Sequence, residues 1–135
     1  MSTVLVDANV LIDVALADPT WSGWSRRALE RAGDESVLII NPIVYAEIAA
    51  GFGTVEEVEE VLPAEDFVRE ALPWPACFLA GRCFVTYRRR GGEKRSPLPD
   101  FFIGAHAVVS GHKLLTRDAK RYRSYFPTVD LIAPE

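Results

Sequence analysis

The residues most able to do chemistry in this chain are carboxylates that stand in otherwise apolar sequence. Asp7 directly follows the apolar run TVLV, and Asp118 closes the segment KLLTRD. Glu47 is the only charged residue in PIVYAEIAAGF, and Asp100 is the only Asp, Glu, Lys or Arg in PLPDFFIGAHAVVSGH. Burying a carboxylate without a partner is costly or forces it to stay protonated. Each of these four acids therefore needs a partner or a function.

Each acid also has an ordinary structural explanation. Asp7 and Asp100 are suitable helix caps, since Asp is favoured at that position. Asp118 is a suitable turn residue after a strand, and Glu47 could form a salt bridge with an arginine. Together these explanations require four independent coincidences. A single hypothesis accounts for all four acids if they meet at one edge of a sheet.

A cluster of four carboxylates predicts a bound divalent cation. Two carboxylates about 4 Å apart repel by about 4 kcal/mol at an effective dielectric constant near 20, so the cluster needs a counter-charge. Oxygen ligands favour Mg²⁺ or Mn²⁺ over zinc, and the chain has no HExxH or paired-cysteine zinc spacing. Such a site suits phosphodiester hydrolysis, because metal ions lower the pKa of a bound water and stabilise charge on phosphate.

Two polar residues stand close to these acids. Asn9 lies two residues after Asp7, and Thr116 lies two residues before Asp118. Both are able to orient a carboxylate or a water molecule by hydrogen bonding. They are equally explained as a turn residue and a strand residue.

The apolar patterns predict the elements that would position these side chains. Short β-branched runs predict strands at residues 3–6, 37–40, 113–116 and 129–132. Helical spacing and capping signals, among them Asn41 before Pro42 and Thr54 with Glu57, predict helices at residues 21–32, 42–52, 55–62, 75–90 and 100–111. Short buried strands separated by helices indicate an α/β fold, a three-layer α/β/α sandwich with a central parallel sheet. Asp7 and Asp118 would then stand at the carboxyl ends of strands, where ligands bind in such sheets.

Composition limits the remaining classes of protein. The 135 residues fit one domain, residues 1–135, and the net charge of −4 argues against a general coat of positive charge for nucleic acid. No basic leader precedes the first apolar run, and no apolar run reaches the ~18 residues of a membrane span, so we expect a soluble, cytoplasmic protein. Cys77 and Cys83 are expected to be reduced, since their spacing in a helix turns them apart. The basic stretch from Arg88 to Arg95 is either a solvated helix end or a contact for RNA phosphates.

The segments DANVLID, YAEIAAG, PDFFIGAHA and LLTRD resemble, in order and spacing, the signature segments of the PIN domain. Chain length and the helical middle are most similar to VapC-type toxins of toxin–antitoxin pairs. The resemblance implies a Mg²⁺- or Mn²⁺-dependent endoribonuclease that acts on RNA, usually dimeric and held inactive by a cognate VapB-type antitoxin. It also implies roles for particular residues: Asp7, Glu47, Asp100 and Asp118 as catalytic and metal-binding acids, with Asn9 and Thr116 as polar supports.

Other classes of protein fit less well. Phosphatases of the haloacid dehalogenase type need a second Asp where this chain has Asn9, and signal receivers need an acidic pair after the first strand. A non-toxin PIN nuclease or a PIN scaffold that binds RNA remains the alternative, although a scaffold would be expected to lose one or more acids. Trp21 and Trp24 are candidates for an antitoxin or dimer contact, or for core packing, and His106 and His112 favour structural roles.

Overall fold

A computed structural model describes residues 2–135 and contains a five-stranded sheet in the order β3-β2-β1-β4-β5. Every pair of neighbouring strands is parallel. The strands are β1 (Ser2–Val6), β2 (Ser36–Ile40), β3 (Val68–Arg69), β4 (Lys113–Leu115) and β5 (Leu131–Ile132). The predicted α/β class with a central parallel sheet is therefore confirmed.

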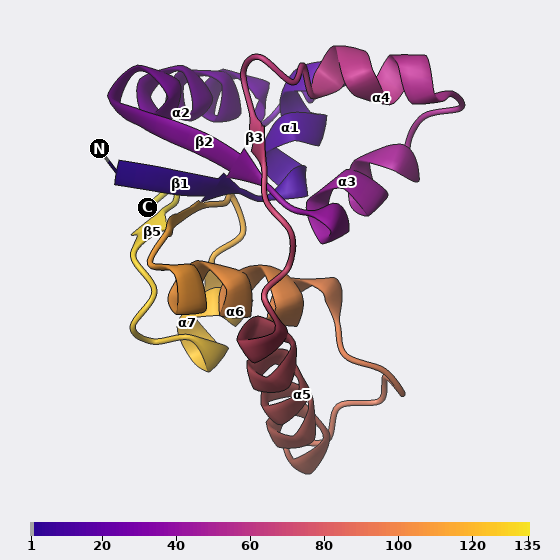
Figure 1. Cartoon of the computed structure of the whole chain (residues 1–135), viewed down its shortest axis with the longest axis vertical. Helices are drawn as coiled ribbons and strands as arrows, with labels where there is room; N and C mark the ends of the chain where they lie inside the picture. Colours follow the sequence, from indigo (N-terminus) through magenta and orange to yellow (C-terminus); the bar gives the residue numbers. More distant parts are fainter. Residues whose placement is uncertain (1) are drawn as a thin grey trace.

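Helices cover both faces of this sheet. They are α1 (Ala8–Ala15), α2 (Ser22–Glu35), α3 (Pro42–Ala49), α4 (Val55–Val61), α5 (Trp74–Arg89), α6 (Pro99–Ser110) and α7 (Lys120–Tyr125). Figure 1 shows α1, α2 and α4 on one side of the strands and α6 and α7 on the other, with α5 projecting outward. Within residues 2–135, no helix combines the length and apolar character that crossing a membrane requires.

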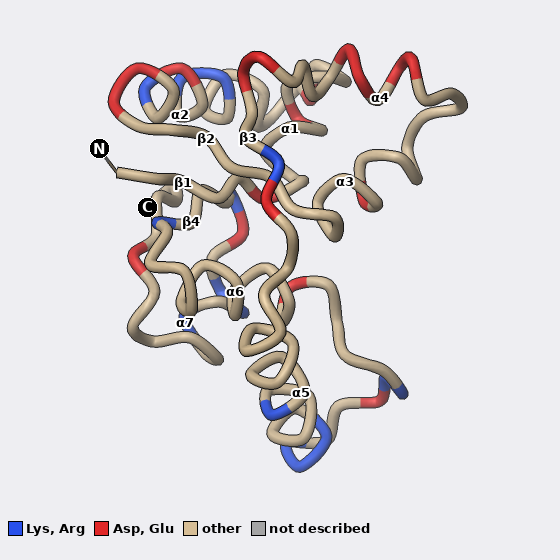
Figure 2. Tube along the Cα trace, viewed as in Figure 1, with Lys and Arg blue, Asp and Glu red and all other residues tan. Residues whose placement is uncertain are grey.

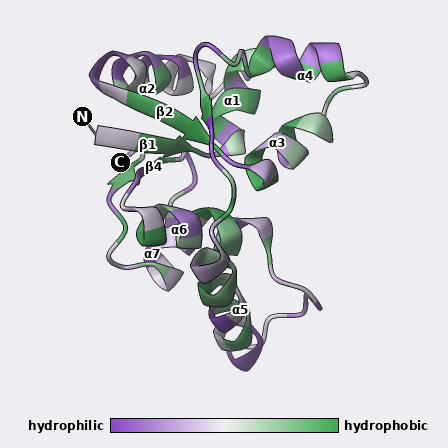
Figure 3. Cartoon of the chain, viewed as in Figure 1, coloured by the Kyte–Doolittle hydropathy of each residue, from purple (hydrophilic) through white to green (hydrophobic). Residues whose placement is uncertain are grey.

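The central strands are apolar because both of their faces are covered. Val4, Leu5 and Val6 of β1 have no exposed surface, and neither has Leu114 or Leu115 of β4. Figure 3 shows the hydrophobic colour along most of β2, in which Leu38, Ile39 and Ile40 are buried. Continuous apolar strands of this kind are typical of parallel sheets between two helical layers.

Local signals in the sequence set several helix ends as predicted. Asn41 caps α3, since its side-chain oxygen accepts a hydrogen bond from the Val44 amide at 2.9 Å. Thr54 caps α4 in the same way, accepting from the Glu57 amide at 3.2 Å. Gly111 ends α6 with a φ of 70°, a left-handed conformation that glycine adopts without strain.

Two elements, β3 and α7, were not predicted, and α1 was implied only as the helix that Asp7 would cap. β3 pairs with the edge of β2 through only two residues, whose side chains are exposed, so it leaves no apolar pattern. α7 lies in the charged segment KRYRSY and buries only Tyr122, which is too little for a recognisable helical period. The predicted bounds also shift, because β4 ends at Leu115 and Thr116 follows the strand instead of belonging to it, while β5 is shorter than predicted.

The strand order creates a place where the chain changes direction across the sheet. From β1 the chain adds β2 and β3 on one side, whereas β4 and β5 lie on the other side of β1. Val6 pairs with Leu115 where β1 and β4 end, and the Asp7 amide then donates to the Leu115 carbonyl at 2.9 Å. Ligands in open α/β sheets bind at such a switch point, beyond the carboxyl ends of the strands.

Candidate metal centre

Asp7 occupies the switch point between β1 and β4. It is 4% exposed and stands at the N-cap position of α1, but its side chain makes no capping hydrogen bond. The ordinary explanation of Asp7 as a helix cap is therefore not supported by the geometry, and its carboxylate is directed to other partners.

Three donors reach the same oxygen of Asp7. Thr116 Oγ1 donates to Asp7 Oδ2 at 2.9 Å, the Tyr122 hydroxyl donates at 2.8 Å, and Asn9 Nδ2 donates at 3.3 Å. The Asn9 amide is itself oriented, because its oxygen accepts from the Arg117 backbone amide at 3.2 Å. Both polar residues singled out in the sequence thus contact Asp7, and together with Tyr122 they fix the plane of its carboxylate.

Glu47 brings an unpaired carboxylate to this point from α3. Its side chain is half-buried, and within residues 2–135 its Oε1 is the only buried side-chain oxygen or nitrogen without a hydrogen-bond partner. Burial, together with the nearby charges of Asp7 and Asp100, raises the pKa of Glu47 to about 7. Glu47 therefore lacks the arginine that would explain it structurally.

Asp100 lies in the first turn of α6, as predicted, and is coupled to the other acids. Burial raises its pKa, Asp118 adds to the rise, and Arg121 and Tyr122 oppose it. The Tyr122 hydroxyl that donates to Asp7 also lies 3.4 Å from Asp100 Oδ1. Burial and the charge of Asp100 in turn raise the pKa of Asp7 to about 6.

Asp118 approaches the group from the segment after β4. It lines a surface hollow together with Asp100, and the other lining residues are Tyr87, Lys120, Arg121, Ser124 and Tyr125. Its backbone amide donates to Thr116 Oγ1 at 3.2 Å, which ties the position of Asp118 to the threonine that holds Asp7. The structure thus brings Asp7, Glu47, Asp100 and Asp118 to one edge of the sheet, and we call these four residues the acidic cluster.

The acidic cluster is short of positive charge. Arg121 is the one cation paired with it in the described residues, with Nη1 3.3 Å from Asp100 Oδ2, and this ion pair is partly exposed to solvent. Mutual repulsion, raised pKa values and the unpartnered Glu47 oxygen are the features that a divalent cation would relieve. Since the available ligands are oxygens, the residues fit Mg²⁺ or Mn²⁺.

A fifth acid, Asp13, is a buried carboxylate whose oxygens all have hydrogen-bond or ion-pair partners. Asp13 is 2% exposed, and it accepts from Ser25 Oγ at 2.8 Å. Arg117 adds a two-point contact, with Nε 2.9 Å from Oδ2 and Nη2 3.2 Å from Oδ1. Asp13 therefore has a structural role, although the sequence places it in the same DANVLID segment as Asp7.

Sequence reasoning missed Tyr122 and Arg121, which contact the acidic cluster from α7. Because α7 has no clear apolar period, nothing in the sequence marked Tyr122 as a buried side chain. The cationic Arg121 stands in a run of charged residues that resembles any solvated helix. No signal in one sequence would have separated these two residues from their neighbours.

The basic and aromatic candidates have mostly local partners. Arg88 donates to the carbonyls of Gly92 and Lys94, and Arg90 packs 4.8 Å above the Tyr125 ring. Figure 2 shows the basic residues grouped at the end of α5, far from the acidic residues along α4. Trp24 packs against the core, and Arg117 lies 5.7 Å from the centre of the Trp21 ring.

Several solved structures of toxin–antitoxin proteins are similar to this chain in fold at low sequence identity. The chain is similar to VapBC2 from Rickettsia felis, bound to a DNA fragment from its promoter (TM-score 0.74, 17% identity, covering 98% of this chain and 99% of that chain). It is also similar to VapBC-1 from nontypeable Haemophilus influenzae (TM-score 0.72, 17% identity, 97% of each chain). A toxin–antitoxin complex from Klebsiella pneumoniae matches with TM-score 0.61 and 21% identity over 98% of each chain.

Sequence comparison gives the family. No curated protein matches the chain at a significant level. A family model described as the PIN domain, however, matches residues 4–126, a span that contains all four residues of the acidic cluster. The chain therefore belongs to the PIN domain family.

Proposed function

We propose that this PIN domain, taken as a single domain over residues 1–135, is a metal-dependent endoribonuclease. Asp7, Glu47, Asp100 and Asp118 are its catalytic and metal-binding residues, and Mg²⁺ or Mn²⁺ is its cofactor. The observation that carries the proposal is the buried, unpartnered Oε1 of Glu47 beside the carboxylates of Asp7 and Asp100. A protein rarely keeps such an oxygen unless a ligand completes its environment.

The side chains around the acidic cluster have separate tasks in this function. Asn9, Thr116 and Tyr122 hold Asp7 through Oδ2, so its second oxygen is the one that we assign to the cation. When bound, the cation would lower the pKa of a water molecule and stabilise the negative charge on the phosphate. Arg121, which lines the same hollow as Asp100 and Asp118, is placed to attract the phosphate once the carboxylates are neutralised.

The surroundings of the acidic cluster support a nucleic acid as substrate. Lys120 and Arg121 line the same hollow as Asp100 and Asp118, and Tyr87 and Tyr125 line it as well. Cationic and aromatic side chains side by side are suited to single-stranded RNA, whose phosphates and unstacked bases are both accessible. In a chain of net charge −4, this local group concentrates binding at the site.

We further propose a toxin role, with neutralisation by a cognate VapB-type antitoxin. The full-length similarity to chains of toxin–antitoxin complexes supports this role. On α5, Trp74 is 87% exposed and Phe78 is 72% exposed, so an apolar surface is available for an antitoxin or for the second copy of a homodimer. We expect the protein to act in the cytoplasm, where its RNA substrate is found.

The test of the nuclease proposal is incubation of the purified chain with structured RNA in Mg²⁺, with and without EDTA, beside Asp7→Asn. We expect cleavage that both the chelator and the substitution abolish. Cleavage that neither of them diminishes would contradict the metal mechanism. Binding of RNA without cleavage in Mg²⁺ or Mn²⁺ would instead favour the alternative, a PIN scaffold.

A further inference from the structure

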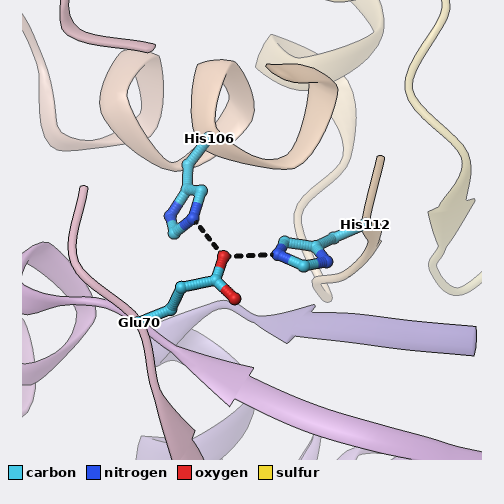
Figure 4. A group of neighbouring side chains, drawn as sticks. All are labelled: Glu70, His106 and His112. Carbon is cyan, nitrogen blue, oxygen red and sulfur yellow. Dashed lines mark hydrogen bonds and ion pairs between the residues drawn. The ribbon is translucent and has the colours of Figure 1, made fainter. Parts of the chain in front are cut away.

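A second polar cluster, separate from the acidic cluster, lies between α6 and the sheet. Glu70 follows β3, His106 belongs to α6 and His112 precedes β4, and we call these three residues the Glu70 cluster. Figure 4 shows both imidazole rings directed at one oxygen of Glu70, with His106 Nε2 2.8 Å and His112 Nε2 2.7 Å from Oε1. His106 is completely buried and His112 nearly so, whereas the Glu70 side chain is about one-third exposed.

The partners of the rings fix the direction of these hydrogen bonds. Asn41 uses its side-chain oxygen to accept from the Val44 amide, so its Nδ2 group faces His106 Nδ1 at 3.0 Å and donates to it. An Nδ1 that accepts leaves the ring proton of neutral His106 on Nε2. His106 therefore donates to Glu70 through Nε2, and Thr3 Oγ1 takes the corresponding place beside His112 Nδ1.

Two histidines and a glutamate are also a ligand set for zinc-like ions, and their ligand atoms lie within 4.8 Å of one another. A ligating Nε2 must be unprotonated, which would move the His106 proton to Nδ1, against the N–H of Asn41. The nitrogen-to-oxygen separations of 2.7 and 2.8 Å are also shorter than the roughly 3.3 Å between ligands of a tetrahedral zinc site. The geometry favours a hydrogen-bonded cluster over a metal site.

The position of this network relates it to the acidic cluster. Each group that surrounds Glu70, directly or through a ring, lies in or directly before an element that contains one of the four acids or leads into it. These pairs are Thr3 of β1 with Asp7, Asn41 at the start of α3 with Glu47, His106 of α6 with Asp100, and His112 before β4 with Asp118. Glu70 itself is anchored to β2, since its amide donates to the Ile40 carbonyl at 2.9 Å.

We propose that Glu70, His106 and His112 are positioning residues that hold the four acid-bearing elements in the register that the acidic cluster requires. The inference rests on the proposed function of that cluster. One carboxylate oxygen that accepts from two rings, each fixed by a further partner, restrains β1, α3, α6 and β4 together. Sites with several ligands lose affinity when their supporting hydrogen bonds are removed, by about 10-fold to 100-fold for partners of the ligands themselves.

The test compares Glu70→Ala with Glu70→Gln by Mg²⁺ titration calorimetry, RNA cleavage and thermal melting. We expect Glu70→Ala to bind Mg²⁺ about tenfold more weakly and to lower kcat with little change in KM. Glu70→Gln keeps an oxygen that accepts from both rings, so it is expected to recover most of the affinity. His112→Phe, which removes one donor and fills the space, provides an intermediate case if Glu70→Ala does not fold.

Glu59→Gln is the matched control. Glu59 also accepts two side-chain hydrogen bonds, from Tyr45 at 3.0 Å and from Arg69 at 2.7 Å, but it connects to only one acid-bearing element, α3 through Tyr45, and does not join several of them. The Glu59→Gln variant should therefore have the same Mg²⁺ affinity and kcat as the unsubstituted protein. Nitrogen-15 spectra of the histidine rings in the unsubstituted protein give a readout that is independent of activity, with the His106 proton expected on Nε2.

Three results would overturn the positioning role. They are a folded Glu70→Ala variant with the Mg²⁺ affinity and kcat of the unsubstituted protein, a His106 proton on Nδ1, and one equivalent of Zn²⁺ bound to Asp7→Asn but not to Asp7→Asn combined with Glu70→Gln. If the unsubstituted chain binds neither Mg²⁺ nor Mn²⁺, the proposed function fails, and this outcome is distinct from unchanged affinity in Glu70→Ala.

Discussion

The acidic cluster and the Glu70 cluster are built from the same kind of carboxylate and have opposite electrostatics. Burial alone would raise the pKa of Glu70, but the hydrogen bonds from His112 and His106 hold that pKa below its ordinary value. In the acidic cluster, burial and neighbouring negative charge raise the pKa of Glu47 to about 7 and that of Asp7 to about 6. The hydrogen bonds to Glu70 outweigh the effect of its burial, whereas the three side-chain donors to Asp7 do not, and Glu47 Oε1 has no donor.

This difference separates structural from functional acids better than burial does. Asp13 and Asp7 are both almost completely buried and are only six residues apart. Asp13 is neutralised by a two-point contact from Arg117, while Asp7 receives only uncharged donors. A buried acid without a cation, next to other such acids, is therefore the feature that indicates a ligand site.

The largest effect is expected from Glu47→Gln, which keeps the shape of the side chain and removes its charge. RNA cleavage should fall by roughly 10³-fold, the scale of several kcal/mol of metal-assisted stabilisation. The melting temperature in EDTA should stay equal or rise, because repulsion from Asp7 and Asp100 is relieved. Initial cleavage rates and melting curves measured beside Glu59→Gln test both points, and retained activity would contradict the role of Glu47.

The next effect concerns pH. Because the pKa values of Asp7 and Glu47 are raised in the folded chain, the folded state binds more protons than the unfolded state between about pH 4 and pH 7. Stability in EDTA should therefore be greatest at the acidic end of this range and fall as pH rises through it, with Asp7 alone contributing on the order of 3 kcal/mol. Urea unfolding at several pH values measures this loss, which Asp7→Asn should reduce.

The same experiment in saturating Mg²⁺ sharpens the comparison. A cation binds the ionised carboxylates, so protons compete with it and stability should then rise with pH. At a free concentration of about 100 times its dissociation constant, the cation should raise the free energy of unfolding by about 2.7 kcal/mol. Identical pH dependence with and without Mg²⁺ would mean that the acidic cluster does not bind the ion.

A smaller effect is expected from Tyr122→Phe. The ring remains in the core, but Asp7 loses its shortest side-chain hydrogen bond, that from the Tyr122 hydroxyl at 2.8 Å. Mg²⁺ affinity should fall by about tenfold while the fold is retained. Calorimetric titration measures the change, with Tyr125→Phe as the control because Tyr125 makes no hydrogen bond to the acidic cluster; equal affinities in both variants would contradict the orienting role of Tyr122.

The smallest effect is expected from Arg121→Ala, since the Arg121–Asp100 pair is partly exposed and screened by solvent. In an Asp118→Asn background, the affinity for RNA should fall a few-fold. The plot of log affinity against log salt concentration should become less steep by about 0.7. Arg31→Ala removes a more exposed arginine that pairs with Glu35 on α2, and it should change neither quantity. If Arg121→Ala instead speeds cleavage, the arginine neutralises the acidic cluster and does not attract the phosphate.

The sequence was sufficient for the fold class and for the four acids of the acidic cluster as candidates. Strands β1 and β4 are continuous apolar runs, and an Asp soon after such a run stands out. Glu47 and Asp100 stand out for the same reason, because the helices that carry them are otherwise almost free of charge. These signals are local, so they can be recognised without knowing which segments meet.

The partners of the acids could not be predicted, because they depend on contacts across the whole chain. Tyr122 reaches Asp7 from a helix whose sequence resembles a solvated surface. Glu70 ends an acidic stretch and follows a two-residue edge strand, so nothing in its neighbourhood distinguishes it from exposed glutamates. His106 and His112 were assigned structural roles, but their shared acceptor is separated from them by 36 and 42 residues.

The adjacency of β1 and β4 has a consequence for a protein that is made on a ribosome. Asp118 and Tyr122 are synthesised 111 and 115 residues after Asp7. A nascent chain therefore cannot possess the complete group of acids until the segment that follows β4 has been made. If the protein cleaves RNA as we propose, a growing chain cannot do so before that segment has folded against β1.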